Sequence, residues 1–201
     1  MSTTNLKYIA FLKKCLYLKR TVRTGWTYQN VNQPESVADH SFQMALMALT
    51  FPEDKLPKHV DRSLAVQMSI VHDLPECIVT DLAPKQMKEL GITKEKKHEM
   101  ERDALFELRD LLKESNNFDG SLKEESSDVL LETLYFTYEN QSTPTAKFVK
   151  DLDRLEMCIQ ASFYQDIENR DDIAASFYGS SKGKFNFKEV DEYFKSLIEN
   201  I

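Results

Sequence analysis

Residues 69–76, with the sequence SIVHDLPE, constrain this chain more than any other stretch. An apolar helical run ends there on a histidine and an aspartate, and Pro75 then disfavours helical geometry in the residue before it. Asp73 faces the negative end of the helix dipole, which disfavours a carboxylate by about 0.3–1 kcal/mol unless a cation offsets the charge. Imidazole beside carboxylate suits a first-row divalent metal. The stretch therefore predicts a metal site, provided that other helices supply further ligands.

The composition favours a single helical domain. The chain has 201 residues, enough for one domain with a substantial core, and only five glycines and six prolines, which argues against a loop-rich all-β fold. We predict an all-α fold in one domain, residues 1–201, with a core over about residues 6–166 and a last helix, 187–198, packed on it.

Charge and cysteine content limit the partners and the location. The net charge of −7 disfavours binding to a nucleic acid polymer or an anionic membrane, because both need a basic surface. No stretch approaches the ~20 apolar residues of a membrane span, and the amino terminus lacks the apolar segment of a signal peptide. The three cysteines have no paired spacing and are typical of reduced thiols. We expect a cytoplasmic protein, with the nucleus as an alternative location.

Apolar residues at helical spacing predict a series of amphipathic helices and no convincing strand. Polar stretches at 19–34, 115–120 and 179–184 predict loops between them. The last of these is not a phosphate-binding loop, since it lacks the G-x-x-x-x-G-K-[ST] spacing. The predicted helices cover about residues 5–18, 36–50, 58–73, 93–114, 122–138, 145–166 and 187–198.

Two polar side chains on other predicted helices are candidates to complete the metal site. His40 falls in the first full turn of the second helix, on its apolar face. A lone histidine there is more often a core residue than a ligand. Asp153 lies at the edge of the buried face of the helix after residue 145, and by itself it would be a surface ion-pair partner. A metal site is the better interpretation only if these two side chains lie close to His72 and Asp73 in the folded chain.

Taken together, these four side chains follow the order H…HD…D, which is the signature of the HD-domain metal-dependent phosphohydrolases. The longer motifs resemble those of the HD domain-containing protein 2 family, whose bacterial relatives are 5′-deoxynucleotidases. The resemblance covers about residues 6–166. The motifs are RTGW at 23–26, PESVADH at 34–40, HDLPE at 72–76, DLAP at 81–84 and KDLD at 150–153.

The resemblance implies an all-α HD bundle that forms a homodimer and binds a divalent cation. It also implies the reaction, which is hydrolysis of deoxynucleoside 5′-monophosphates to deoxynucleoside and phosphate. Mixed nitrogen and oxygen ligation suits Mn²⁺ or Co²⁺ best, with Zn²⁺ or Mg²⁺ as alternatives. The cation would polarise the phosphoryl group and lower the pKa of a water. The implied metal ligands are His40, His72, Asp73 and Asp153.

Glu76 and Asp81 match family acids that work beside this metal. Glu76 is the candidate to orient or deprotonate the attacking water. The alternative is that the two acids hold a second metal or support the ligands of the first.

The resemblance further implies substrate contacts from Arg23, Trp26 and Lys150. From the residues alone, Trp26 is either a core side chain or a surface for a base or sugar, and Arg23 is either solvated or a phosphate ligand. One departure bears on this: the bacterial relatives have an arginine directly before the tryptophan, and Gly25 stands there in this chain. Arg23 and Lys150 are the candidates to replace that arginine.

Two other functions remain open at this stage. HD sites serve several phosphoesters, so the chain could be a phosphodiesterase or pyrophosphohydrolase acting on another nucleotide. It could also be a noncatalytic helical scaffold that keeps a metal for structure alone.

Overall fold

The computed structural model describes residues 3–115 and 126–199, and no β-strand occurs within these ranges. The predicted all-α fold is confirmed. The described part contains one isolated antiparallel bridge, between Val22 and Ser36. The helices are α1 (Thr3–Cys15), α2 (Thr24–Thr27), α3 (Val37–Thr50), α4 (Arg62–Val71), α5 (Glu76–Val79), α6 (Pro84–Leu90), α7 (Lys94–Ser115), α8 (Ser127–Glu139), α9 (Pro144–Glu168), α10 (Ile173–Ser181) and α11 (Lys188–Glu199), with short 3₁₀ helices at Leu16–Lys19 and Glu53–Lys55.

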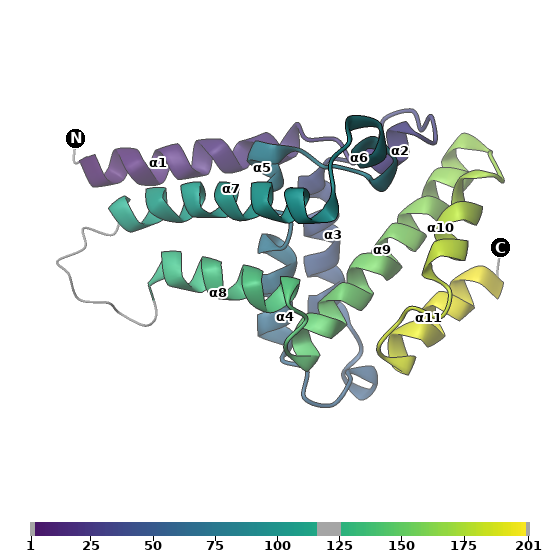
Figure 1. Ribbon diagram of the computed structural model, residues 1–201. Coiled ribbons are helices and arrows are strands. Elements are labelled where there is room, and N and C mark those ends of the chain that lie inside the picture. The colour runs from purple at the N-terminus through teal and green to yellow at the C-terminus, as the bar shows by residue number, and fades with distance from the viewer. Residues whose placement is uncertain (1–2, 116–125, 200–201) are drawn as a thin grey trace.

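The helices fall into two groups around a shared centre (Figure 1). On one side α1, α7 and α8 lie next to one another, and on the other α9 packs against α10 and α11. Between the groups α3 packs on α4, and both contact α9. The helices predicted to carry the metal ligands therefore meet in the middle of the molecule.

Polar caps fix where the central helices begin. The backbone N–H of Asp39 donates to Ser36 Oγ (3.2 Å), and the backbone N–H of Ser36 donates to Asp39 Oδ2 (2.9 Å), which is a complete capping box. At the start of α9, the N–H of Ala146 donates to Thr143 Oγ1 (3.1 Å). These caps set the rotational phase of α3 and α9, and that phase turns His40 inward, where it is fully buried.

Apolar side chains fill three contiguous cores. The largest lies among α3, α4, α9 and α11, and it includes Met44, Met68 and Phe148, none of them more than 1% exposed. Burial of each such side chain contributes about 1.5–3 kcal/mol. A second core joins α1, α5, α7 and α8, and a third surrounds Trp26 beside α10. The polar centre thus sits among well-packed helices.

Two predicted loops contain helices instead. Part of the segment 19–34 forms α2, and Trp26 and Val31 in that segment are buried against α9 and α10. The segment predicted as a loop at 179–184 begins inside α10, which runs to Ser181. Both helices are short and are stabilised by tertiary burial, so helical periodicity is a weak signal for them.

Most helix boundaries agree with the prediction within a few residues, and one does not. The helix predicted from about residue 122 begins at Ser127, after Ser126 in an extended conformation. The turn predicted at 115–120 lies outside the described residues, apart from Ser115, which ends α7.

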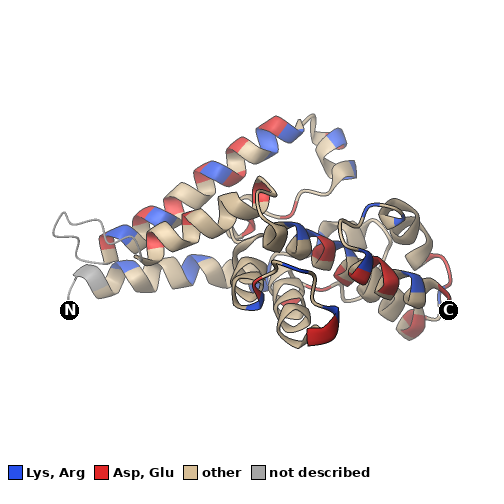
Figure 2. Ribbon diagram, turned by 90° about the horizontal axis from the view of Figure 1, so that it is seen from below, with Lys and Arg blue, Asp and Glu red and all other residues tan. Residues whose placement is uncertain are grey.

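The outer surface carries mixed charge. Figure 2 shows basic and acidic residues interspersed along the helices rather than collected on one of them. Pairs such as Lys96–Glu99 (2.9 Å) join neighbouring turns of α7. None of the described helices is both long enough and apolar enough to cross a membrane.

Candidate metal centre and substrate cavity

Three helices bring the four predicted metal ligands to one place. His40 lies on α3, His72 and Asp73 follow the last residue of α4, and Asp153 lies on α9. His72 Nε2 is 3.0 Å from Asp73 Oδ2, and His40 Nε2 is 3.9 Å from the same oxygen. His40 Nε2 is also 3.4 Å from Asp153 Oδ1. Two imidazole nitrogens and two carboxylates therefore surround one small space.

The second nitrogen of each imidazole is held by the protein. His40 Nδ1 is 2.6 Å from Glu156 Oε2, and His72 Nδ1 is 2.9 Å from the backbone oxygen of Ser69. The Nε2 atoms of both histidines are buried and make no hydrogen bond within the described residues. A carboxylate or backbone oxygen on the far nitrogen is the usual arrangement of a metal-binding histidine, because it fixes the tautomer and ring orientation. These residues fit a divalent cation with nitrogen and oxygen ligands.

The charges at this centre hold one another in ionised forms. Burial and Arg23 lower the pKa of His40, but Glu156 and Asp153 outweigh them and raise it to about 9. Burial raises the pKa of Asp73, but the two histidines and Arg23 outweigh it and hold that pKa well below its usual value. In the absence of metal, a proton on His40 supplies the positive charge at this centre. A metal cation that binds Nε2 would have to displace that proton.

Glu76 is a buried carboxylate at the start of α5, only 3% exposed. Its Oε2 has no hydrogen-bond partner within the described residues, and its Oε1 is 3.7 Å from Lys97 Nζ. Burial, together with the nearby charges of Asp73 and Asp81, raises the pKa of Glu76 well above its usual value. Such a group holds a proton more readily than an ordinary carboxylate does.

Asp81 is hydrogen-bonded to Thr24 of the RTGW motif. Its Oδ2 accepts from the backbone N–H of Thr24 (2.6 Å), and its own backbone oxygen accepts from Thr24 Oγ1 (2.7 Å). The preceding residue, Thr80, has φ 69° and ψ 165°, a conformation that residues other than glycine rarely adopt. This costs roughly 1–3 kcal/mol and persists only where the surroundings enforce it. The strained turn directs the chain from Glu76 to Asp81.

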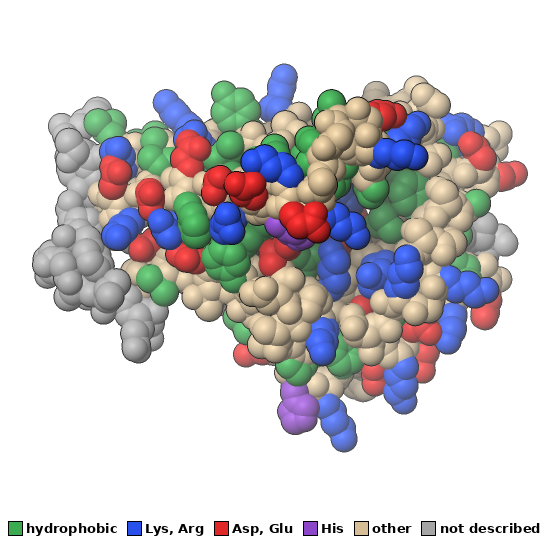
Figure 3. Space-filling model, in the orientation of Figure 1, with side chains coloured by type: hydrophobic (Ala, Val, Ile, Leu, Met, Phe, Trp, Pro, Cys, Tyr) green, Lys and Arg blue, Asp and Glu red, His purple; other side chains and the backbone are tan. Residues whose placement is uncertain are grey.

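A cavity of about 280 Å³ opens beside these acids. Figure 3 shows basic and acidic side chains gathered around a hollow near the middle of this face. Both predicted catalytic acids and all three predicted substrate residues contribute to its wall, whereas His40 and His72 lie behind it. The predicted site residues that line the cavity are Arg23, Trp26, Asp73, Glu76, Asp81, Lys150 and Asp153.

The three predicted substrate residues differ in exposure. Trp26 is 1% exposed and donates from Nε1 to Glu35 Oε1 (2.8 Å), so it is a core side chain whose edge lines the cavity. Arg23 lies 3.5 Å from Asp73 Oδ2 and is largely buried. Lys150 Nζ donates to Asp153 Oδ2 (2.8 Å). The charge of Asp153 raises the pKa of Lys150, which keeps the ammonium charged.

Several polar residues at the centre are absent from the sequence prediction. Lys97 lines the cavity, Glu156 holds His40, and Glu35 accepts from Trp26 and lies 3.8 Å from Arg23 Nε. Glu156 had a usable signal, because it shares a helical stripe with Asp153 three residues earlier. Lys97 had none, since it lies in the strongly charged stretch that forms the start of α7.

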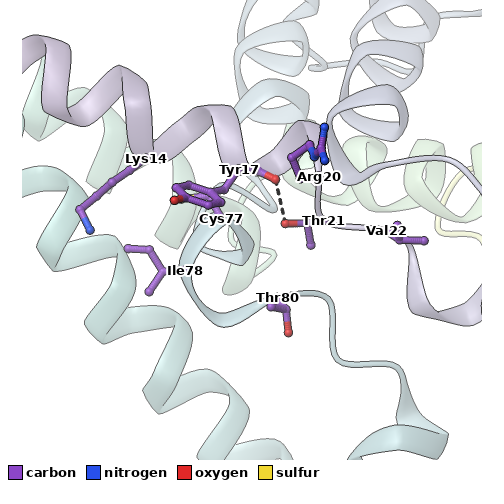
Figure 4. Close-up of a pocket in the computed structure, with 8 residues that line it drawn as sticks. All are labelled: Lys14, Tyr17, Arg20, Thr21, Val22, Cys77, Ile78 and Thr80. Carbon is purple, nitrogen blue, oxygen red and sulfur yellow. Dashed lines mark hydrogen bonds between the residues drawn. The ribbon is translucent and has the colours of Figure 1, made fainter.

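A larger cavity, of about 660 Å³, lies on the other side of α5 (Figure 4). It is lined by residues of α1, the segment 17–22 and the segment 77–80, including Tyr17, Arg20 and Cys77. Among the described residues that line it there is no carboxylate or imidazole side chain, in contrast to the smaller cavity. The predicted metal and catalytic residues thus gather at the smaller cavity and not at this one.

Comparison with known proteins agrees with this geometry. A family model described as the HD domain matches residues 15–191. The human protein named 5′-deoxynucleotidase HDDC2 is 42% identical over 189 residues, 94% of this chain and 83% of the relative. The Danio rerio protein of the same name is 40% identical over 191 residues, 95% and 86% of the two chains.

The fold is also found among solved structures. A conserved hypothetical protein from Pyrococcus furiosus superposes with a TM-score of 0.71 at 27% identity, covering 95% of this chain and 99% of the other. The chain belongs to the HD-domain family, and within it to the group of the HDDC2 proteins, as its motifs indicated.

Proposed function

We propose that this protein is a metal-dependent 5′-deoxynucleotidase, which hydrolyses deoxynucleoside 5′-monophosphates to deoxynucleoside and phosphate. The observation that carries the proposal is the pair of buried Nε2 atoms without hydrogen bonds, next to two carboxylates at the wall of a cavity with three cationic side chains. The names of the relatives support the substrate class.

His40, His72, Asp73 and Asp153 would hold the cation, with Mn²⁺ or Co²⁺ preferred and Zn²⁺ or Mg²⁺ as alternatives. When bound, the cation supplies Lewis-acid polarisation of the phosphoryl group and a more acidic attacking water. Glu156 and the backbone oxygen of Ser69 keep the two imidazole rings oriented for this task.

Glu76 would accept the proton of the attacking water. Its Oε2, in the buried wall of the cavity, has no hydrogen-bond partner among the described residues, and its pKa is raised by burial and by nearby acids; both suit a general base. Asp81, held by Thr24, would orient the water or the phosphate. The alternative, in which Glu76 and Asp81 bind a second metal, uses the same two side chains.

Arg23, Lys97 and Lys150 would offset the charge of the phosphate group. All three line the cavity, where nearby carboxylates keep them charged. A phosphate in the cavity would therefore lie close to positive groups, although the net charge of the chain is −7. The edges of Trp26 and Phe177 would form the apolar wall for the sugar or base.

Phosphate release from dAMP, dUMP and AMP tests the proposal directly. Protein stripped of metal should release little phosphate, and added Mn²⁺ or Co²⁺ should restore the reaction with 2′-deoxy substrates. Activity that is indifferent to chelator would contradict the mechanism. Preference for a cyclic dinucleotide or a pyrophosphate over monophosphates would favour the phosphodiesterase or pyrophosphohydrolase alternative. Under the noncatalytic scaffold alternative, Glu76→Ala should leave folding, metal content and every cellular role intact, whereas a nucleotidase should lose turnover.

We also infer a homodimer built on exposed apolar side chains. Phe42, Leu46 and Leu49 form an exposed row on α3, and Phe163 and Ile167 are exposed on α9, which packs against α3. Association would cover these rows, which are unusual on a monomer. Light scattering of the wild type and of Phe42→Glu tests this: the first should have the mass of a dimer and the second a lower mass.

We further propose that residues 1–201 form one HD domain, because α11 packs on α9 and contributes Phe194 to the largest core. The three cysteines are free, which suits the reducing cytoplasm that we expect as its location. Cell fractionation would test that location.

A further inference from the structure

Besides the substrate cavity, a second cavity opens at the metal centre. It has a volume of about 300 Å³ and reaches the centre from the side of α7 and α8. It shares Asp73, Lys97 and Lys150 with the substrate cavity, and its wall also includes His72. The centre is therefore approached from two sides. None of the groups at the outer end of this second cavity takes part in the proposed reaction.

Three candidate ligands stand together at that outer end. His98 Nδ1 is 3.3 Å from Glu139 Oε2 and 3.9 Å from Glu101 Oε2, and the three ligand atoms all lie within 4.8 Å of one another. Two ligands of a tetrahedral Zn²⁺, each about 2.0–2.2 Å from the ion, are roughly 3.4 Å apart. The spacing is thus already close to that of a bound ion, with His98 exposed and free to adjust.

The neighbouring side chains favour positive charge at this position. Tyr135 lines the same cavity and is 3% exposed. Burial, with Glu101 and Glu139, strongly raises the pKa of Tyr135, which reflects the negative potential there.

Lys97 does not occupy the position of the ion. Its Nζ lies 3.2 Å from Glu101 Oε1, whereas the oxygen that faces His98 is Oε2. Glu101 can therefore bind a cation with one oxygen and keep Lys97 on the other. The site needs no rearrangement of α7 or α8.

We propose that His98, Glu101 and Glu139 bind a divalent transition-metal cation, of the Zn²⁺ class, at the outer mouth of this second cavity. One imidazole and two carboxylates are ligands that Zn²⁺ accepts, and water completes the coordination. The site is distinct from the centre formed by His40, His72, Asp73 and Asp153.

Calorimetric titration of the purified full-length protein with ZnCl₂ tests the site. His98→Ala should bind one equivalent less than the wild type, and Glu139→Gln should lose the same equivalent or weaken it at least about tenfold. His59→Asn is the matched control, since His59 is another exposed histidine, and it should titrate as the wild type does. In His72→Ala, the equivalent that depends on His98 should remain.

Equal stoichiometry and affinity in His98→Ala and the wild type would overturn the inference. Loss of the same equivalent in His59→Asn would also overturn it. Circular dichroism checks that each variant is folded, and the exposed His98 gives little reason for misfolding. Because the readout is metal binding and not turnover, a wild type that failed to hydrolyse dAMP would contradict the proposed function while leaving this test intact.

Discussion

The metal centre and the substrate cavity share a wall but are built differently. His40 and Asp153 project from long capped helices, where the phase of the helix decides which way they point. Arg23, Glu76 and Asp81 project from short helices and turns that have no periodicity of their own. The first group is positioned by local structure, whereas the second depends on contacts such as Thr24 to Asp81 and on strain at Thr80.

This difference predicts different consequences of mutation. Changes at the metal centre should act on cation binding and on everything that depends on it. Changes in the short segments should alter turnover while the cation is retained. The following predictions test that division, from the largest expected effect to the smallest.

His72→Ala should remove both the cation and activity. The substitution deletes a buried ligand nitrogen, so activity with dAMP should fall by at least roughly 10³-fold, since the metal contributes several kcal/mol to catalysis. Metal analysis and phosphate release measure the two effects, with His59→Asn as the control. A His72→Ala protein that keeps its metal and its turnover would show that the centre lies elsewhere.

Glu76→Gln should lower kcat by about 10²–10⁴-fold, because an amide cannot accept the proton of the attacking water. Metal content should remain that of the wild type. Steady-state kinetics and metal analysis of the same preparation decide this. If the variant instead loses one metal equivalent, the second-metal alternative for Glu76 and Asp81 is favoured.

Glu156→Gln should weaken metal binding by about 10–100-fold, the usual effect of losing the charge behind a metal-binding histidine. Glutamine can still accept from His40, so the fold should be retained. Competition with a chelator measures the affinity, and Glu132→Gln is a matched control, since Glu132 is ion-paired with Arg109 rather than with a group of the metal centre. Equal affinities in the two variants would contradict the orienting function of Glu156.

The metal-free protein should lose stability as pH rises. The folded pKa of Glu35 is raised from 4.5 to about 7, mainly by burial, and that of His40 from 6.5 to about 9. Both groups bind protons more tightly when folded, so their contribution is fully present at low pH. It is lost from about pH 4.5 to 7 for Glu35 and from about pH 6.5 to 9 for His40.

Urea unfolding in the presence of chelator, at pH 6 and pH 9, measures this change. The free energy of unfolding should be lower at pH 9, and His40→Gln should remove most of the difference. A metal-free wild type that is more stable at pH 9 would contradict the charge arrangement around His40.

Thr80→Gly should have the smallest effect. Glycine adopts the observed φ of 69° without strain, so stability should rise by up to about 1 kcal/mol. The looser turn should lower kcat a few-fold, since Asp81 is less well directed. Thr80→Ala keeps the strain and serves as the control. Equal stability of the two variants would show that the turn is not strained.

Much of the fold follows from sequence patterns, because the caps and the apolar periodicity of a long amphipathic helix lie within its own sequence and can be recognised there. The capping box of Ser36 and Asp39 and the stripe of α9 set the helix phases that bury His40 and place Asp153 at the same centre. The helices α2 and α10 were missed because they are short and are stabilised by packing around Trp26.

The sequence by itself determined the chemical content of the site: two imidazoles and two carboxylates in the HD order, with two further acids after Pro75. Only the tertiary structure decided how those groups are supported. It placed Glu156 behind His40, Lys97 beside Glu76 and Glu35 at the Nε1 edge of Trp26. It also brought His98, Glu101 and Glu139 to the mouth of a second cavity at the metal centre. Periodicity fixes which face of one helix a residue occupies, whereas contacts between distant segments depend on how the helices pack.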